Sequence, residues 1–422
     1  MTLTTWKILT RLLSLWVPVR VWWRGRSEAG YRVAPGERLG CYTHPASSGW
    51  VWVHAVSLGE TQAARLWIDE LRQQDPYMRL LLTHGTATGR EAGKALLREG
   101  DVQVWAPWDS ASATQKFFAH FQPKVGYLLE TEVWPQLALS ARAAQCPLWL
   151  INARLSEQSL QKAQRLGALA HMAFSALTGV VAQTQDDANR IAQLNGNVVG
   201  CSGNIKFDAK PHPEQVAQGR AMRVGTPQPV VMLSSTREGE ERMWLDAVAS
   251  CQNEVQWLLV PRHPQRVDEI EALCQQAGWQ VIRRSSLLPQ QPWPVAQPGQ
   301  ATLWLGDTMG EMPLYYGMAD VALLGGSFAP MGGQNLIEAV ASGCPVIAGP
   351  HTFNFAAAVQ ALCAVGAAKQ VPHMQQAVQT ACQWVQQPQA LQTKREAGLK
   401  VIEQARGAVA RTLQLISSAT KP

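Results

Sequence analysis

Two acidic residues in the first half of the chain follow apolar runs, at positions where a side chain can act on a bound molecule. Glu60 comes after the run 51–56, and Glu130 comes directly after the run 125–129. If both runs are parallel strands, their carboxyl ends lie at one edge of a sheet, so both carboxylates are expected at the same crevice. A structural role is the alternative. Glu60 would then complement a helix dipole, and Glu130 would cap the next helix at the surface.

A lysine lies where the first series of strands and helices ends. It is Lys206, in the segment GNIKFD. An ammonium group binds phosphate as a compact point charge, so Lys206 is expected to meet a phosphate or a developing negative charge between two domains. The alternative is an exposed lysine of a linker.

Residues 320–351 have the pattern of a phosphate-binding turn. The apolar run 321–324 precedes a glycine-rich stretch, and a helix capped by Asn335 is expected to begin with Leu336 and Ile337. The glycines are Gly325, Gly326, Gly332 and Gly333. Glycine lets the backbone approach a ligand, and the first N–H groups of a helix attract an anion. The segment predicts a phosphate cradle for a nucleotide sugar; the alternative is two tight turns between packed elements.

One carboxylate is expected to bind the sugar of the nucleotide. Glu338 lies one turn into the helix, where it can accept hydrogen bonds from both ribose hydroxyls. On a solvated helix face it would instead be an ordinary surface glutamate.

Other segments of the second half also place polar groups directly after a strand. Ser234, Ser235 and Thr236 carry hydroxyls suited to a phosphate, although Ser235 with Glu238 also fits a helix capping box. Arg262, after Pro261, is expected to point into a cleft, and the segment Met309-Gly310-Glu311 repeats this layout. No Asp-X-Asp pair occurs, so a metal-bridged pyrophosphate has no evident ligands, and no metal or cofactor is expected.

The N-terminal end is basic and rich in tryptophan. Residues 1–40 carry seven Lys and Arg against two Glu, which is +5 of the total charge of +6. This points to an anionic lipid surface rather than to nucleic acid. We expect an interfacial membrane helix over residues 1–24, the alternative being a signal-anchor that spans the bilayer. Its polar face would hold Thr4, Lys7, Arg11, Ser14 and Pro18, with Trp6, Leu13, Trp16, Trp22 and Trp23 around it.

From residue 50 onwards, short apolar runs alternate with helical segments. This alternation predicts an α/β fold with parallel, doubly wound sheets. A Gly- and Pro-rich stretch at 203–228 interrupts the alternation, so two Rossmann-like domains facing a cleft are expected. The predicted domains are 25–208 and 209–422, and the last helices can pack back on the N-terminal domain. The eight cysteines show no CxxC spacing and are expected as reduced thiols.

A series of motifs resembles the Kdo (3-deoxy-D-manno-octulosonate) transferases of lipopolysaccharide assembly in order and spacing. The motifs are WVHAVSLGE, LLETEVWP, NARLS, GNIKFD, STREGEE, PRHPQR, GDTMGE and GPHTFNF. The resemblance covers the chain from its N-terminal anchor to its last helices, and it implies the bilobal GT-B fold. It is weakest at 285–300 and beyond 370.

The resemblance implies an inverting glycosyltransferase that moves Kdo from CMP-Kdo to the lipid A precursor lipid IVA. The reaction would occur on the cytoplasmic side of the inner membrane without a metal, with the acceptor in the N-terminal domain and the CMP-sugar in the C-terminal domain. By position, Glu60 matches the catalytic base, and Glu130 and Lys206 match residues that stabilise the transition state. The CMP-binding segments match Pro261-Arg262, Met309-Gly310-Glu311 and Asn335-Leu336-Ile337-Glu338.

The proposed base has an expected charge state. An unperturbed glutamate has a pKa of about 4.3, and the first turn of a helix favours the ionised form further. Glu60 is therefore expected to be ionised at neutral pH.

Two positions depart from the family pattern, and two other functions stay open. Arg237 and Gln334 stand where the family usually has histidines, near the expected donor site. One alternative is another GT-B enzyme that uses a UDP-sugar. The second is a non-catalytic, membrane-tethered binding protein with two lobes. The sequence does not indicate how many Kdo residues are added.

Overall fold

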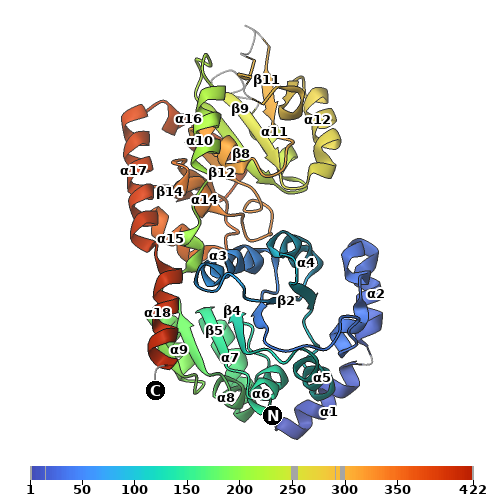
Figure 1. The fold of residues 1–422 in the computed structure, drawn as a ribbon. Helices are drawn as coiled ribbons and strands as arrows, with labels where there is room; N and C mark the ends of the chain where they lie inside the picture. The colour runs from blue at the N-terminus through green and yellow to red at the C-terminus, as the bar shows by residue number, and fades with distance from the viewer. Residues whose placement is uncertain (1, 15, 249–254, 290, 295–299, 421–422) are drawn as a thin grey trace. The chain divides into compact units, whose positions relative to one another are not determined.

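The computed structural model describes residues 2–14, 16–248, 255–289, 291–294 and 300–420. The chain forms two compact units, the first made of Met1–Asp208 with Ala405–Pro422 and the second of Ala209–Gln404 (Figure 1). Each unit is built on a seven-stranded parallel sheet. The prediction of two doubly wound α/β domains is confirmed. The end of the chain lies in the first unit; the sequence placed the domain boundary at 208/209 and allowed the last helices to pack back on the N-terminal domain.

The sheet of the first unit has the strand order β3-β2-β1-β4-β5-β6-β7. Its strands are Val51–His54 (β1), Leu80–His84 (β2), Val102–Trp105 (β3), Val125–Leu129 (β4), Leu148–Ala153 (β5), Gly179–Ala182 (β6) and Val198–Cys201 (β7). The order reverses between β1 and β4, which pair in parallel. Such a reversal opens a crevice at the carboxyl ends of the two strands. The segments that hold Glu60 and Glu130 begin at this point.

Both faces of this sheet are covered by helices. Trp52 and Leu128 on one face pack with α5, α6 and α8, and Val53 and Leu129 on the other pack with α3 and α18. Beyond residue 50, the α-helices of the first unit are Leu58–Gln74 (α3), Ala87–Gly93 (α4), Ala111–Phe121 (α5), Pro135–Ala143 (α6), Glu157–Leu166 (α7), Ala168–Phe174 (α8), Gln185–Ala192 (α9) and Ala408–Thr420 (α18). The 3₁₀ turns are Ala29–Arg32 (η1), Pro35–Leu39 (η2), Lys94–Leu96 (η3) and Ile205–Asp208 (η4). The alternating side chains of a strand therefore supply two apolar cores.

The N-terminal segment forms two helices, Leu3–Ser14 (α1) and Val17–Ser27 (α2), so the single helix expected over residues 1–24 is wrong. Pro18 lies in the first turn of α2. Proline fits a first turn, but it cannot continue a helix because it lacks an N–H and its ring clashes with the preceding turn. In the described residues, no helix is long and apolar enough to cross a membrane.

Helix α1 packs against the rest of the first unit, and the side chains that it directs inward differ from those expected. Trp6 Nε1 donates a hydrogen bond to Asp109 Oδ2 at 3.0 Å, and Thr10 is buried. Trp6 is therefore directed at the protein, whereas the sequence placed it on the interfacial surface. Ile8, Leu9, Leu12 and Leu13 are the large apolar residues of this helix that are exposed.

The sheet of the second unit has the order β10-β11-β9-β8-β12-β13-β14, with its reversal between β8 and β12. Its strands are Val230–Thr236 (β8), Gln256–Pro261 (β9), Gln280–Arg283 (β10), Thr302–Leu305 (β11), Val321–Leu324 (β12), Val346–Ala348 (β13) and Ala368–Gln370 (β14). The sequence did not predict β14, because Lys369 and Gln370 interrupt its apolar pattern at the sheet edge. The segments after β8 and β12 meet at the reversal.

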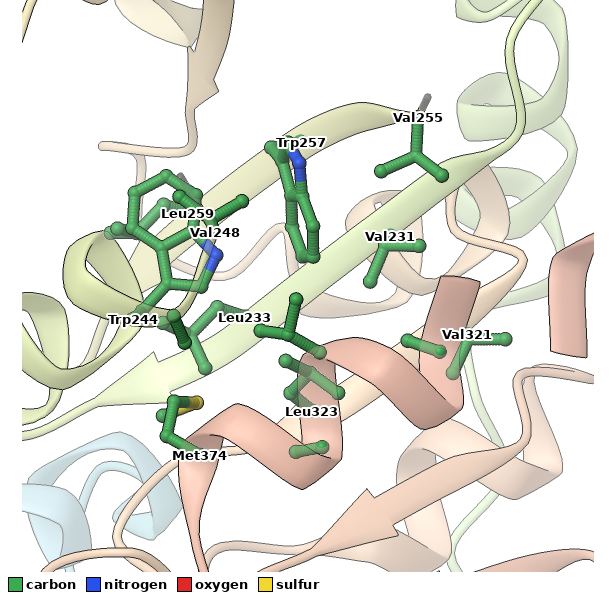
Figure 2. Packing of buried hydrophobic residues seen from close by; sticks show 14 of the residues in the cluster. Val231, Leu233, Trp244, Val248, Val255, Trp257, Leu259, Val321, Leu323 and Met374 are labelled. Atoms are coloured by element: carbon green, nitrogen blue, oxygen red, sulfur yellow. The ribbon is translucent and has the colours of Figure 1, made fainter. Parts of the chain in front are cut away.

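One face of this second sheet carries an extensive apolar core. Leu233 and Leu323 from the strands pack with Trp244 of α11 and Met374 of α16 (Figure 2). The helices of the second unit are Pro213–Met222 (α10), Glu240–Val248 (α11), Val267–Gln276 (α12), Met312–Met318 (α13), Leu336–Ala341 (α14), Ala356–Ala364 (α15), Met374–Val385 (α16) and Pro388–Ala405 (α17). Its 3₁₀ turns are Pro264–Arg266 (η5) and Arg284–Ser286 (η6). This core fixes β8 and β12, which carry the expected donor segments.

Asp208 attaches the C-terminal helix to the first unit. Its carboxylate accepts hydrogen bonds from the N–H groups of Gly407 (2.6 Å), Ala408 (3.2 Å) and Val409 (2.7 Å). The first N–H groups of a helix have no partners inside the helix. A residue 199 positions earlier thus caps α18.

We expect Asp208→Ala to lower the free energy of unfolding by about 2 kcal/mol, because three N–H groups lose their acceptor. Urea denaturation followed by circular dichroism measures the change, and hydrogen exchange should accelerate first in α18. Asp186→Ala removes an exposed carboxylate from α9 and serves as the control. Equal stability of the two variants would contradict this capping role.

Candidate active site

Glu60 lies in the turn between β1 and α3. Ser57 is the N-cap of α3, and its Oγ accepts a hydrogen bond from Glu60 N. The Glu60 carboxylate in turn accepts hydrogen bonds from Ser57 Oγ and from Val56 N, both at 2.8 Å. The structural alternative is therefore partly correct, since Glu60 helps to start the helix. Each carboxylate oxygen keeps acceptor capacity for a further proton.

Glu60 was expected to be ionised at neutral pH, and the surroundings of its side chain correct this expectation. The side chain is 8% exposed, and burial raises the pKa of Glu60 to about 7, with further contributions from Glu132 and Glu130. The hydrogen bonds from Val56 and Ser57 lower the pKa but do not outweigh burial. The carboxyl group is therefore close to half ionised at neutral pH, which suits a group that must both take up and release a proton.

Glu130 and Lys206 lie together. Lys206 Nζ is 2.6 Å from Glu130 Oε1, and the two side chains are 16% and 19% exposed. Lys206 is therefore not an exposed lysine of a linker. Glu130 has a left-handed backbone (φ 60°), and its N–H donates to Ile151 O of the neighbouring strand. This backbone geometry sets the position of the ion pair at the end of β4.

A third acid near Glu60 was missed by the sequence analysis. Burial raises the pKa of Glu132, and Glu130 raises it further. Glu132 Oε2 accepts a hydrogen bond from Trp134 Nε1 at 2.8 Å. The spacing Glu-Thr-Glu after β4 is a possible signal, but nothing in the local pattern indicates which acid turns inward.

Two buried histidines support the turn that holds Glu60. His84 Nδ1 donates to Ala55 O at 2.8 Å, and Gln103 Nε2 donates to His84 Nε2 at 2.9 Å. Burial lowers the pKa of His84 to about 3 and that of His54 to about 4. Both rings are therefore neutral, and His84 fixes the residue next to Val56.

In the second unit, the carboxylate of Glu240 binds four backbone N–H groups. Its Oε2 accepts from Arg237 N (2.9 Å) and Gly326 N (2.7 Å), and its Oε1 accepts from Phe328 N and Ala329 N, both at 3.0 Å. The side chain is fully buried. It thus joins the turn after β8 to the glycine-rich turn after β12. The sequence analysis did not identify this role.

The glycine-rich turn fits closely on the end of β8. A Cβ on Gly325 would lie 2.4 Å from both Ser234 O and Ser235 O, so only glycine allows this approach. Gly333 has a φ of +78°, and its N–H donates to Gly326 O at 2.8 Å. The turn is folded back on itself and is rigidly held before α14 begins.

The three hydroxyls at the end of β8 make contacts inside the protein. Ser234 Oγ donates to Leu323 O at 3.1 Å, and Thr236 Oγ1 donates to Glu241 Oε1 at 2.6 Å. Ser235 has a φ of 54° and lies five residues before the start of α11, so it does not occupy the N-cap position of a capping box. Phosphate binding by these three residues stays a prediction.

Two arginines lie at the carboxyl ends of β8 and β9. The pKa of Arg262 is lowered by burial and then by the charge of Arg237, and Glu338 opposes this shift. Arg237 donates to His263 Nε2 at 2.7 Å. Burial and the neighbouring arginines lower the pKa of His263, so this ring accepts the hydrogen bond as a neutral group. A bound anion would relieve the repulsion between the arginines.

The remaining residues predicted to bind the CMP-sugar lie in two segments. Met309 is exposed, Gly310 has a φ of +79°, and Glu311 is paired with the buried Arg284 at 3.2 Å. Asn335 stands at the N-cap of α14, but its side chain makes no capping hydrogen bond, contrary to the prediction. Leu336 and Ile337 have fully buried side chains, so only their backbone could contact a bound nucleotide. Glu338 is half-buried.

No metal centre is evident in the part of the chain that the structure describes. There, no group of three or more His, Cys, Asp or Glu residues is placed to share an ion. Arg237 and Arg262 place positive charge at the carboxyl ends of β8 and β9.

We expect Glu240→Gln to reduce the free energy of unfolding by about 3 kcal/mol. An amide NH₂ cannot accept a hydrogen bond, so two of the four backbone N–H groups lose their partner. Hydrogen exchange should accelerate at Gly326, Phe328 or Arg237. Glu238→Gln, at an exposed position of the same turn, is the control, and unchanged exchange in Glu240→Gln would refute the role.

The chain resembles solved glycosyltransferase structures. A glycosyltransferase from Rickettsia africae ESF-5 superposes with a TM-score of 0.56 at 12% sequence identity, over 89% of this chain and 100% of that one. At this identity the likeness concerns the fold alone. It confirms the predicted GT-B type.

Sequence relatives identify the family. Residues 34–209 match the family model described as 3-deoxy-D-manno-octulosonic-acid transferase (kdotransferase). The 3-deoxy-D-manno-octulosonic acid transferase of Bordetella pertussis is 41% identical, covering 97% of this chain and 96% of that one. The enzyme of the same name from Haemophilus influenzae is 31% identical, covering 92% and 91%. The chain therefore belongs to the 3-deoxy-D-manno-octulosonic acid transferase family and is a glycosyltransferase.

Proposed function

We propose that this enzyme transfers Kdo from CMP-Kdo to the lipid A precursor lipid IVA, with inversion at the anomeric carbon. Family membership supports Kdo transfer in lipopolysaccharide synthesis. The observation that carries the mechanism is the buried carboxyl of Glu60 at the strand reversal, with a pKa raised to about 7.

In the proposed reaction, a sugar hydroxyl of the acceptor attacks the anomeric carbon of Kdo. The hydroxyl proton passes to Glu60 while the new C–O bond forms and the bond to the CMP phosphate breaks. A single displacement inverts the anomeric centre. A carboxylate is a weak base toward an alcohol, so its position contributes more than its basicity.

The second unit is proposed to bind the donor. Arg237 and Arg262 stabilise the charge that develops on the leaving phosphate, as charge-assisted donors do in other transferases. Glu338, electrostatically coupled to Arg262, accepts hydrogen bonds from the ribose. The proposal includes no metal ion or cofactor. Lys206, paired with Glu130, is proposed to stabilise the transition state.

The alternative donor is a UDP-sugar, which an enzyme of the same GT-B fold could use. A UDP-sugar would use the same strand ends, so competition between CMP and UDP for the protein separates the two readings. Membership of the family makes the chain an enzyme, which sets aside the non-catalytic binding protein.

Helices α1 and α2 are proposed to lie on the anionic, cytoplasmic surface of the inner membrane. Trp16, Trp22 and Trp23 are 67%, 54% and 68% exposed. The guanidinium of Arg26 lies 3.9 Å from the ring centre of Trp22. Exposed tryptophans next to basic residues are typical of an interfacial segment.

We expect Glu60→Gln to lower Kdo transfer by at least about 100-fold, the usual contribution of a general base, with CMP affinity unchanged. Protonated Glu60 cannot accept the hydroxyl proton, so the wild-type rate should rise with pH through about 7. Mass spectrometry of lipid IVA incubated with CMP-Kdo measures the product. Glu70→Gln, on the same helix, is the control. Near-normal transfer by Glu60→Gln would make Glu130 or Glu132 the next candidate.

Replacing Trp16, Trp22 and Trp23 together by glutamine should weaken binding to phosphatidylglycerol vesicles by about tenfold or more, because each ring loses apolar burial. Vesicle sedimentation of the full chain measures it. Tyr77→Gln changes an aromatic residue that is 94% exposed elsewhere on the first unit. If both proteins sediment alike, α1 and α2 are not the membrane contact.

A further inference from the structure

A cavity of about 450 Å³ lies in the first unit, under the N-terminal helices. Its walls are mostly apolar: Leu13, Val17 and Val21 come from α1 and α2, and Trp108 and Leu137 lie opposite. The volume is within the roughly 300–1,000 Å³ of small-molecule sites. No residue that the sequence analysis proposed for substrate binding lines this cavity.

Two residues that line the cavity each have a buried hydrogen-bond donor without a partner in the described residues. Arg38 donates to Gly85 O at 3.0 Å and lies 3.9 Å from the centre of the Trp105 ring, yet its buried Nε has no partner in the described residues. The same is true of Trp108 Nε1. Both atoms can only donate a hydrogen bond.

The charges of the lining favour an anion. Arg20, Arg24 and Arg38 line the cavity together with Asp109 and Glu132. Asp109 already accepts hydrogen bonds from Trp6 Nε1 and Leu137 N, at 3.0 and 2.9 Å. Burial raises the pKa of both acids.

The cavity lies close to the proposed base and reaches the surface. Val56, which donates its N–H to Glu60, is part of the lining. Leu13 and Trp134 also line it and are 44% and 46% exposed, so the cavity reaches the surface there. Next to Leu13, the exposed Leu12 and Ile8 continue the apolar surface of α1.

We propose that this cavity binds one acyl chain of the lipid acceptor, and that Arg20 and Arg38 bind the phosphate nearest to that chain. A mostly apolar cavity with three arginines in its lining matches a molecule that joins a hydrocarbon chain to an anion. The inference rests on the proposed function, since it takes the acceptor to be a phosphorylated, acylated sugar. It gives α1 and α2 a second role, as one wall of the acceptor site.

Calorimetric titration of the full chain with dodecyl phosphate, below its micelle concentration, tests the site directly. Leu13→Trp fills the cavity at its exposed end and should weaken binding by about tenfold or more. Leu12→Trp makes the same change at the neighbouring exposed position outside the lining, and should bind as the wild type does. Thermal unfolding midpoints confirm that both variants are folded.

A second matched pair of variants tests whether an arginine of the lining binds the phosphate group. Arg20→Gln should weaken binding of dodecyl phosphate by about tenfold, whereas Arg26→Gln, on the same helix but outside the lining, should not. Inorganic phosphate, which lacks the chain, should bind at least about tenfold more weakly than dodecyl phosphate.

Two results would overturn the inference: unchanged binding in Leu13→Trp, or equal losses in Leu13→Trp and Leu12→Trp. Glu60→Gln should bind dodecyl phosphate normally. If the wild-type protein binds dodecyl phosphate but transfers no Kdo from CMP-Kdo to lipid IVA, the proposed function is contradicted and the binding role of the cavity is not.

Discussion

Buried carboxylates that bind backbone N–H groups set the geometry at the strand ends of both units. Glu60 accepts from Val56 N at the end of β1, and Glu240 accepts from four N–H groups between β8 and β12. A turn between a strand and a helix leaves N–H groups without partners, and a buried carboxylate satisfies them without water. The candidate catalytic and donor segments are held in place by these interactions.

For Glu60, the same burial has a chemical consequence. A carboxylate that only capped a helix at the surface would keep a low pKa, whereas burial and the nearby Glu130 and Glu132 raise the pKa of Glu60 to about 7. The hydrogen bonds from Val56 and Ser57 oppose that shift and hold the group in position. The side chain that starts the helix is therefore also the one proposed as the base. Glu240, in contrast, is enclosed by backbone and serves the loop alone.

The sequence predicted the strands well because each carries a short apolar run, and the order of motifs pointed to the family. It missed β14, whose edge position lacks such a run, and the break before Pro18, where apolar composition masked a proline. It also missed Glu240 and Glu132. Packing between distant segments decides which acid of Glu-Thr-Glu or Glu-Gly-Glu-Glu turns inward. Glu240, for example, binds the N–H of Phe328, which lies 88 residues further along the chain. The local sequence pattern does not show which distant segment a side chain will contact.

The central claim is that Glu60 is a buried base whose pKa is set by its surroundings. Difference infrared titration of the carboxyl C=O band, comparing the wild type with Glu60→Gln, measures that pKa without any assay of transfer. The account predicts a band, absent from Glu60→Gln, that titrates at about pH 7. A difference band that titrates at the ordinary value for glutamate, about 4.3, would contradict it.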